Sequence, residues 1–243
     1  KGLNGARYNN PTLTKALEWA RHGGFSELFK RIDTPTDRKK ILLELKSFTL
    51  HYDKILVISA PMTNIVGLTI AEIAARGGME PEEAMVETIR VSEGRAEILG
   101  RTVSSKNTRT AVEHDISMIS SDGFGLSEIA AKSGSLVHPR SFGAFPHFWH
   151  RFVMDFKSIS PEKAIYKISG GPAARIGLSK RGILQKGNIA DIAIFDPHAF
   201  RDTANYRSPF KYAQGIKSVL VNGTLAVENA KVTSNRNGAV LRK

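Results

Sequence analysis

The sequence contains no cysteine, so the chain forms no disulfide bond and holds no zinc ion through thiolates. It also lacks any apolar run close to the roughly 20 residues that a membrane-spanning helix needs, and its first residues show no signal-peptide pattern. We therefore expect no membrane partner. The chain starts with Lys1 in place of methionine, so we expect that its natural beginning has been removed. The compartment stays open between cytoplasm and secretion.

A clustered basic surface is also missing, although 35 Lys and Arg against 23 Asp and Glu give a net charge of +12. Proteins that bind nucleic acids gather such charges on one helix or stripe. Beyond Arg201 the basic residues stand singly, and the cluster Arg38–Lys40 belongs to an amphipathic helical pattern. The sequence therefore predicts no nucleic-acid partner. A non-catalytic binding or structural module with a basic surface remains an alternative.

The first three quarters of the chain alternate between helical and strand patterns. Helical spacing occurs at residues 13–20, 25–32, 80–92, 108–114, 145–156 and 160–168, and strand-like apolar runs at residues 54–60, 97–99 and 115–121. In the helix at residues 160–168, Ala164, Ile165 and Ile168 are expected to face inward. Thr69 and Glu72 have the spacing of a capping box. This alternation is typical of an α/β protein.

From Gly182 onward the pattern changes to strands and turns. Residues 189–195 alternate as a strand, and Asn222-Gly223 separates two short β-branched runs, which is the strongest short signal for a hairpin. The sequence therefore predicts two parts, an α/β domain at residues 1–178 and a small, mainly β domain at residues 179–243.

One stretch carries the best candidate for chemistry. The apolar run Asp115–Ser121 ends on Asp122 and Gly123, which predicts a buried strand that delivers a carboxylate to a turn. Functional groups of α/β folds lie at the carboxyl ends of strands. Asp-Gly is also a common turn pair, because Asp bonds its own backbone and Gly accepts positive φ. From these residues alone, a catalytic and a purely structural interpretation both stay open.

His147 and His150 are the other candidates for a metal. Their i, i+3 spacing would place both on one helix face, but they are surrounded by aromatic residues and no third ligand stands nearby in the sequence. The pattern favours packing over metal binding.

Several segments together resemble a known enzyme family. They are ISMISSDG, HPRSFGAFP, SPEKAIYKISGGPAARIGLSKRGILQKGNIADIAIFDP and GIKSVLVNGTLAVENAKVT. Combined, they look like the C-terminal half of the N-acyl-D-amino-acid deacylases, or D-aminoacylases, of the amidohydrolase superfamily. The last two segments are shared across the superfamily, whereas HPRSFGAFP after SDG is the discriminating part. The resemblance implies the C-terminal part of a (β/α)8 barrel at residues 1–178 and the C-terminal strands of a small β-sandwich at residues 179–243.

The resemblance also implies roles for two residues. Asp122 matches the aspartate that assists the metal centre and moves a proton between the attacking water and the leaving amine, and Arg140 matches the arginine that binds the substrate's α-carboxylate. The implied cofactor is Zn²⁺, and the implied substrate is a small N-acyl-D-amino acid. The family's other metal ligands would precede Lys1, so the missing N-terminal half of the same protein is the implied partner, and we expect this chain alone to be inactive.

The chain departs from the family pattern at one position. The family usually has arginine after FP, where this chain has His147. The accepted acyl or side-chain group is therefore open, and an amidohydrolase that acts on another amide, such as a cyclic amide, is a second alternative.

Overall fold

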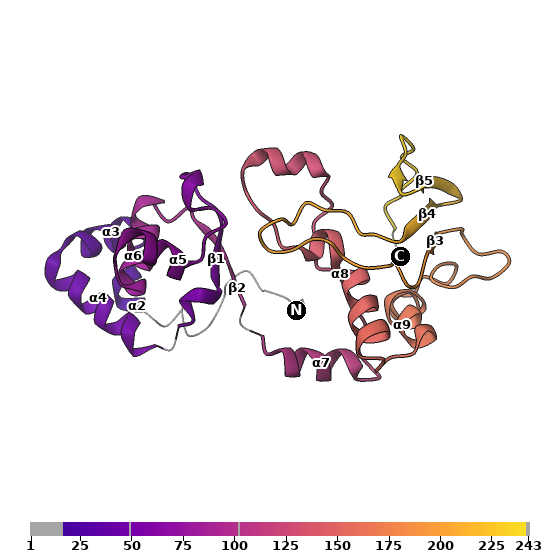
Figure 1. Ribbon diagram of the computed structural model, residues 1–243, viewed down its shortest axis with the longest axis horizontal. Helices are drawn as coiled ribbons and strands as arrows, with labels where there is room; N and C mark the ends of the chain where they lie inside the picture. The colour runs from indigo at the N-terminus through magenta and orange to yellow at the C-terminus, as the bar shows by residue number, and fades with distance from the viewer. Residues whose placement is uncertain (1–16, 49, 102, 242–243) are drawn as a thin grey trace. The chain divides into compact units, whose positions relative to one another are not determined.

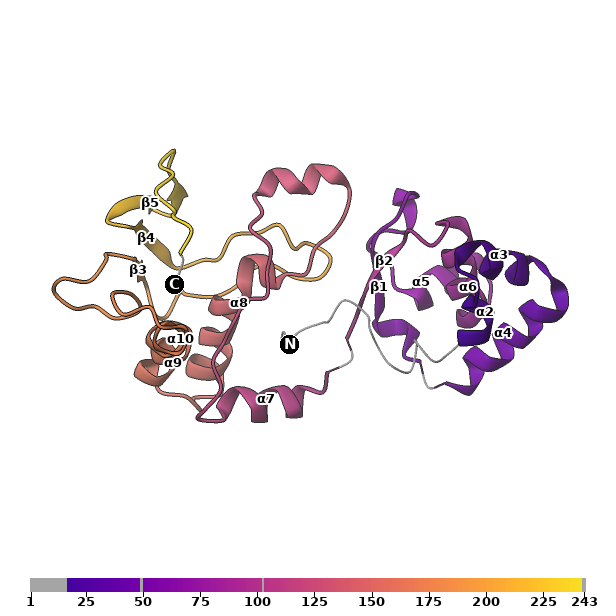
Figure 2. The same ribbon diagram turned by 180° about the vertical axis from the view of Figure 1, so that it is seen from behind.

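The computed structural model describes residues 17–48, 50–101 and 103–241, which form two compact units. The first unit comprises the described residues up to Val103 together with Ser127–His138, and the second comprises Ser104–Leu126 and the chain from Pro139 onward (Figures 1 and 2). Residues 13–16 of the first expected helix lie outside the described ranges. Among the described residues, no helix has the length and apolar content to cross a membrane.

The first unit consists of short helices and a two-stranded sheet. In chain order its elements are α2 (Glu18–Arg21), α3 (Phe25–Asp33), α4 (Pro35–Ser47), η1 (Tyr52–Lys54), β1 (Ile55–Ser59), η2 (Thr63–Ile65), α5 (Ile70–Gly77), α6 (Pro81–Val91), β2 (Glu97–Gly100) and η3 (Glu128–Ser133). One apolar cluster joins α2, α3, α4 and α6, and a second lies between β1, α5 and α6. Burial of these apolar faces is the main stabilising contribution that the unit receives.

Local sequence signals account for several elements of this unit. The run predicted at residues 54–60 forms β1, whose first four residues are buried and which pairs antiparallel with β2. The predicted capping box begins α5, because the Thr69 hydroxyl accepts from the Glu72 amide and the Glu72 carboxylate accepts from the Thr69 amide. Such reciprocal bonds satisfy two donors that the helix leaves without a partner.

The second unit consists of four α-helices, a π-helical turn and an antiparallel sheet. Its elements are α7 (Ser105–Glu113), α8 (Arg140–Phe148), η4 (Trp149–Asp155), α9 (Pro161–Ile168), α10 (Gly170–Ile176), β3 (Ile192–Phe195), β4 (Ile216–Val221), β5 (Thr224–Glu228) and β6 (Lys231–Val232). The strands follow the order β3-β4-β5-β6, of which β3, β4 and β5 are labelled in Figure 1. The predicted hairpin turn joins β4 and β5, with φ of 49° at Asn222 and 80° at Gly223, as a turn of primed type requires.

Helix α8 begins earlier than the sequence pattern predicted. Pro139 precedes it with helical backbone angles, and its carbonyl accepts from the amides of Phe142 and Gly143. Pro146 lies inside α8, and the chain then continues as the π-helix η4. Proline removes one backbone donor from a helix, and π-helical turns are rare and occur mostly within α-helices.

The segment Asp115–Ser121 is not the buried strand that the sequence predicted. It is a turn followed by chain without regular secondary structure, with no sheet partner in the described residues, and Ile116 is 85% exposed. Ile119 is buried, but its amide donates to the carbonyl of Lys167 in α9 rather than to a neighbouring strand. A strand requires a partner strand to satisfy its backbone groups, and the described residues offer none here.

The inward face of α9 also differs from the expectation. Ala164 is buried as predicted, but Ile165 is exposed, and the buried position at the end of the helix is Lys167. The predicted domain boundary near Leu178 falls inside the second unit, between α10 and β3. It remains a prediction about how the chain divides into domains.

Candidate active site around Asp122 and Arg140

A tight loop carries Asp122. Its backbone has φ of 45°, in the left-handed region that Asp tolerates better than most residues. The Asp122 amide donates to the Ser120 hydroxyl at 3.4 Å, and the Gly123 amide donates to the Ser121 hydroxyl at 3.3 Å. These local bonds stabilise a tight turn of the chain at Asp122.

The loop rests on the first turn of α8. A Cβ atom added to Gly123 would lie 2.8 Å from Cα of Ser141 and 3.3 Å from the carbonyl oxygen of Arg140, so only glycine permits this approach. The next amide, of Phe124, donates to the Ser141 hydroxyl at 3.2 Å. Gly123 and Ser141 therefore fix where Asp122 stands relative to α8.

The structure brings together the two residues that the sequence singled out. Nη2 of Arg140 lies 2.9 Å from Oδ2 of Asp122, although 18 positions separate the residues in the chain. The Arg140 side chain is 15% exposed and that of Asp122 is 59% exposed. The site thus has a guanidinium held at the base of the loop and a carboxylate open to solvent on one side.

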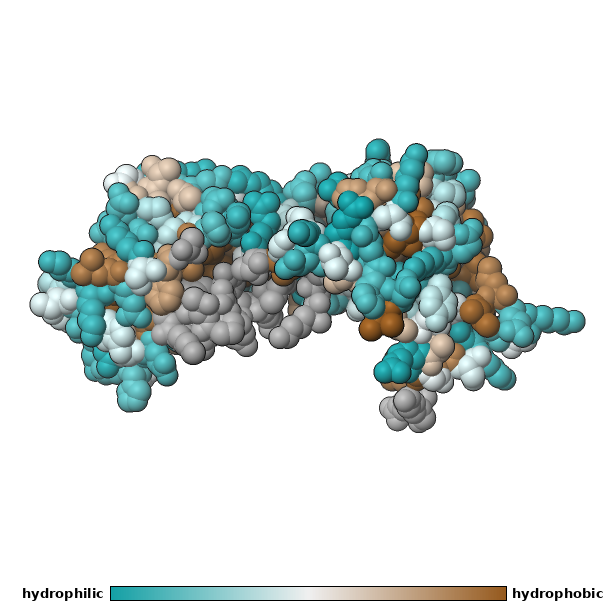
Figure 3. Space-filling model, turned by 90° about the horizontal axis from the view of Figure 1, so that it is seen from below, coloured by the Kyte–Doolittle hydropathy of each residue, from teal (hydrophilic) through white to brown (hydrophobic). Residues whose placement is uncertain are grey.

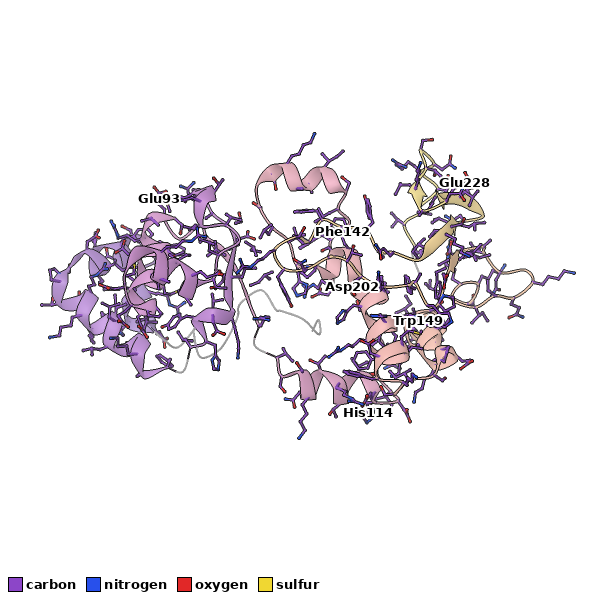
Figure 4. The ribbon with its side chains drawn as sticks, in the orientation of Figure 1. Glu93, His114, Phe142, Trp149, Asp202 and Glu228 are labelled. Atoms are coloured by element: carbon purple, nitrogen blue, oxygen red, sulfur yellow. The ribbon has the colours of Figure 1, made fainter. Side chains whose placement is uncertain are left out.

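His147 and His150 do not converge on a metal site. Nδ1 of His147 lies 3.1 Å from Oδ2 of Asp202, and Nε2 of His150 lies 3.6 Å from Oδ1 of Asp155. Asp202, which is labelled in Figure 4, lies beside Gly143 of α8. In the part of the chain that the structure describes, no three His, Asp or Glu side chains group as metal ligands.

Sequence reasoning missed two features of this site. Ser141 follows Arg140 directly, but nothing in the sequence indicates that its hydroxyl accepts from Phe124. Asp202 lies 55 positions from His147, and its sequence neighbourhood carries no local signal for the contact. Both contacts depend on tertiary structure, which local patterns do not report.

The fit of Gly123 against α8 leads to a testable expectation. Gly123→Ala should displace Asp122 from Arg140, because the added methyl group meets backbone atoms that cannot swing aside. We expect a loss of stability of about 1 to 3 kcal/mol in urea unfolding. Gly125→Ala is the matched control, since a Cβ atom there meets nothing within 4 Å. Equal stability of the two variants would contradict the packing described here.

A model of the amidohydrolase family matches residues 48–227, which is most of the chain and includes both residues of the site. The chain belongs to the amidohydrolase family. The segments ISMISSDG and HPRSFGAFP, which carried the resemblance, lie wholly within this match, and GIKSVLVNGTLAVENAKVT begins within it. Membership confirms the family that the sequence indicated.

Three curated amidohydrolases from Alcaligenes xylosoxydans xylosoxydans are similar to this chain. An N-acyl-D-aspartate deacylase is 27% identical over 207 residues, covering 85% of this chain and 39% of the relative. An N-acyl-D-glutamate deacylase is 31% identical over 185 residues, covering 76% and 35%. A D-aminoacylase is 38% identical over 126 residues, covering 52% and 25%. The chain thus spans well under half the length of each of these relatives.

Solved amidohydrolase structures also resemble this chain. A D-aminoacylase with a binuclear metal center has a TM-score of 0.66 and 29% identity, covering 78% of this chain and 38% of that one. The N-acyl-D-glutamate deacylase from Bordetella bronchiseptica, complexed with zinc and a phosphonate inhibitor, has a TM-score of 0.67 and 28% identity, covering 79% and 38%. This likeness confirms the predicted α/β amidohydrolase fold class.

Proposed function

We propose that this chain is the C-terminal part of a metal-dependent hydrolase that cleaves the amide bond of N-acyl-D-amino acids. The observation that carries the proposal is the contact between Asp122 and Arg140, in a chain of the amidohydrolase family. A carboxylate and a guanidinium side by side provide the two groups that the reaction needs from this region. One group moves a proton, and the other binds the carboxylate of the substrate.

Asp122 is proposed to carry the proton. Its carboxylate would accept a proton from the attacking water and return it to the leaving amine. A base within hydrogen-bonding reach of the reacting atoms contributes typically 10²- to 10⁴-fold to the rate. Its side chain is 59% exposed and is therefore accessible to a substrate.

Arg140 is proposed to bind the α-carboxylate of the substrate. A guanidinium holds a carboxylate through two parallel hydrogen bonds, which fix the orientation of the α-carbon and so allow a D residue to be distinguished from an L residue. In the structure, the Asp122 carboxylate contacts Nη2 of this guanidinium. A bound substrate would therefore compete with Asp122 for Arg140 and leave the Asp122 carboxylate free for the proton.

The proposed zinc ion needs more ligands than this chain offers. A catalytic zinc normally has three protein ligands and one open position, where it lowers the pKa of a bound water to about 7. The exposed carboxylate of Asp122 suits one such position, but the described residues bring no further ligands to it. The chain by itself does not fit the metal, and the remaining ligands would have to come from another polypeptide segment.

Uncovered apolar residues around Asp122 support the need for that segment. Ile116, Met118 and Phe124 are all exposed, and together they flank the loop on both sides. Figure 3 shows hydrophobic residues, in brown, reaching the surface of both units. Large exposed apolar side chains near a functional residue are typical of surfaces that another segment covers. We propose that this segment is the N-terminal half of the same enzyme, and we call the two halves together the assembled enzyme.

The first test concerns metal. We expect the purified 243-residue chain, loaded with zinc and then dialysed, to retain far less than one zinc ion per chain, because Asp122 supplies only one ligand. Metal analysis by mass spectrometry measures the content. Stoichiometric zinc would contradict the proposal, and its loss in His147→Ala or His150→Ala would then assign the metal to the histidine pair.

The second test concerns the substrate. The assembled enzyme should hydrolyse N-acetyl-D-amino acids and leave their L enantiomers and cyclic amides such as hydantoin intact. Release of the free amino acid, followed by chromatography, measures this selectivity. Cleavage of the cyclic amide alone would favour the alternative amidohydrolase activity. A properly folded, zinc-loaded assembled enzyme without any amide hydrolysis would favour a binding module.

A further inference from the structure

A buried lysine contacts the chain segment that leads to Asp122 and has no role in the proposed site so far. Lys167, in the last turn of α9, is only 1% exposed. Its Nζ atom donates to the carbonyl oxygens of His114 at 2.5 Å and Ser117 at 2.9 Å, and to the hydroxyl of Ser117 at 2.8 Å. An ammonium group has three N–H donors, so these three acceptors use all of them.

The backbone of Lys167 makes a fourth bond to the same segment. Its carbonyl accepts from the amide of Ile119 at 3.1 Å, so side chain and backbone together hold the chain at His114, Ser117 and Ile119. Ile119 is buried at this point. The segment that was expected to be a strand is thus fixed by a lysine instead of by a strand partner.

These bonds are the first of two anchors that flank Asp122. The second is the contact of Gly123 and Phe124 with Ser141 on α8. Only two residues, at positions 120 and 121, separate Ile119 from Asp122. With both anchors in place, the backbone at Asp122 is held from both sides, while its carboxylate stays exposed. Without the first anchor, the loop would be held from one side only.

We propose that Lys167 is a positioning residue, which holds the segment His114–Ile119 so that Asp122 stands where the reaction needs it. This inference rests on the proposed function of Asp122. Lysine suits the position because its ammonium reaches three diverging acceptors in a buried place, where carbonyl groups without donors would be costly. Burial, and secondarily the charge of Lys163, lowers the pKa of Lys167, whereas Asp115 acts in the opposite direction.

The same helix provides a matched control. Lys163 lies one turn before Lys167 and forms an ion pair with Asp115, whose pKa it lowers. Their side chains are 43% and 81% exposed, respectively. Exposed ion pairs contribute little to stability, so Lys163→Met removes a lysine from α9 without removing the bonds to the backbone.

Hydrogen–deuterium exchange on the 243-residue chain tests the anchor directly. We expect Lys167→Met, which has a similar length and no donor, to accelerate exchange at residues 114–124 at least about tenfold. Peptides from β3 to β5 and the Lys163→Met control should keep their rates within about threefold. Unchanged exchange at residues 114–124 would overturn the inference. Acceleration throughout the second unit would also overturn it, because Lys167 would then support the unit as a whole.

If Lys167→Met does not fold, Lys167→Gln decides the same question, since it keeps two N–H donors on a shorter side chain. Local acceleration at residues 114–124 in this variant supports the inference. Unchanged exchange, or failure of both variants to fold, overturns it.

Kinetics of the assembled enzyme provide the functional measurement. Lys167→Met should lower kcat about tenfold and leave KM within about twofold, because a displaced Asp122 affects the reaction more than substrate binding. A rise in KM alone, or normal kcat, would contradict the positioning role. The exchange result does not depend on catalysis, so an inactive wild-type enzyme would refute the proposed function and not the anchor.

Discussion

Asp122→Asn is expected to lower kcat of the assembled enzyme by roughly 10²-fold or more, with a smaller change in KM. Asparagine keeps the size of the side chain and can still accept a hydrogen bond from Arg140, but it cannot take up a proton at neutral pH. The proton between the attacking water and the leaving amine would then lack a carrier. Steady-state kinetics with an N-acetyl-D-amino acid measures the effect.

Asp115→Asn is the matched control for this variant. It makes the same chemical change seven positions earlier in the chain, at a carboxylate that pairs with Lys163. We expect its kcat to stay within about twofold of wild type, because the loss of an exposed ion pair costs little. A near-normal kcat for Asp122→Asn would show that Asp122 has only a structural role in the turn.

Arg140→Lys should raise KM for N-acyl-D-amino acids and lower kcat/KM about tenfold or more. Lysine keeps the positive charge but cannot form the planar pair of hydrogen bonds with a carboxylate. A hydrogen bond to a charged group contributes about 1.5 to 3 kcal/mol, which sets the expected size. For the corresponding substrate amide, which has no free carboxylate, kcat/KM should fall far less, because this substrate does not use the contact with Arg140.

Comparison of the two substrates separates binding from loop support. Arg140 also contacts Asp122, so its replacement could disturb the loop, and that disturbance would affect both substrates equally. Arg109→Lys is the control for an arginine to lysine change, at an exposed pair with Glu113. Equal losses on both substrates for Arg140→Lys would mean that Arg140 holds the loop and not the substrate.

Elements with local signals were predictable from the sequence. The capping box of α5 and the Asn222-Gly223 turn are both observed, because each depends on residues within four positions of one another. The same holds for the strand character of residues 55–59, where a β-branched run coincides with burial. Each of these signals comes from residues within the element itself, so it can be recognised without knowledge of the tertiary structure.

The strand predicted at Asp115–Ser121 was wrong for a physical reason. An apolar run predicts a strand only if another strand satisfies its backbone, and here the bond from Ile119 goes to Lys167 in α9. The burial of Lys167 could not be predicted from the sequence either, because its acceptors lie about 50 positions away. In addition, lysine is almost never fully buried in proteins. Contacts at such separations are set by tertiary structure.

The candidate site was predictable in part. The sequence identified Asp122 and Arg140 separately, through the resemblance to the deacylases, and the family match confirms the family on which that rested. Their direct contact and the support from Ser141 became apparent only in the structure. The roles of the two residues remain predictions, because a family match does not assign a role to a single residue.

The central claim is that Asp122 and Arg140 serve one substrate, with Arg140 on its carboxylate and Asp122 on its proton. A crystal structure of the assembled enzyme with a phosphonate analogue of an N-acyl-D-amino acid tests this most directly. We predict that both terminal nitrogens of Arg140 bind the carboxylate of the analogue and that Asp122 has left Arg140 to face the phosphonate. An analogue whose carboxylate is held elsewhere, with Asp122 still paired to Arg140, would contradict the account.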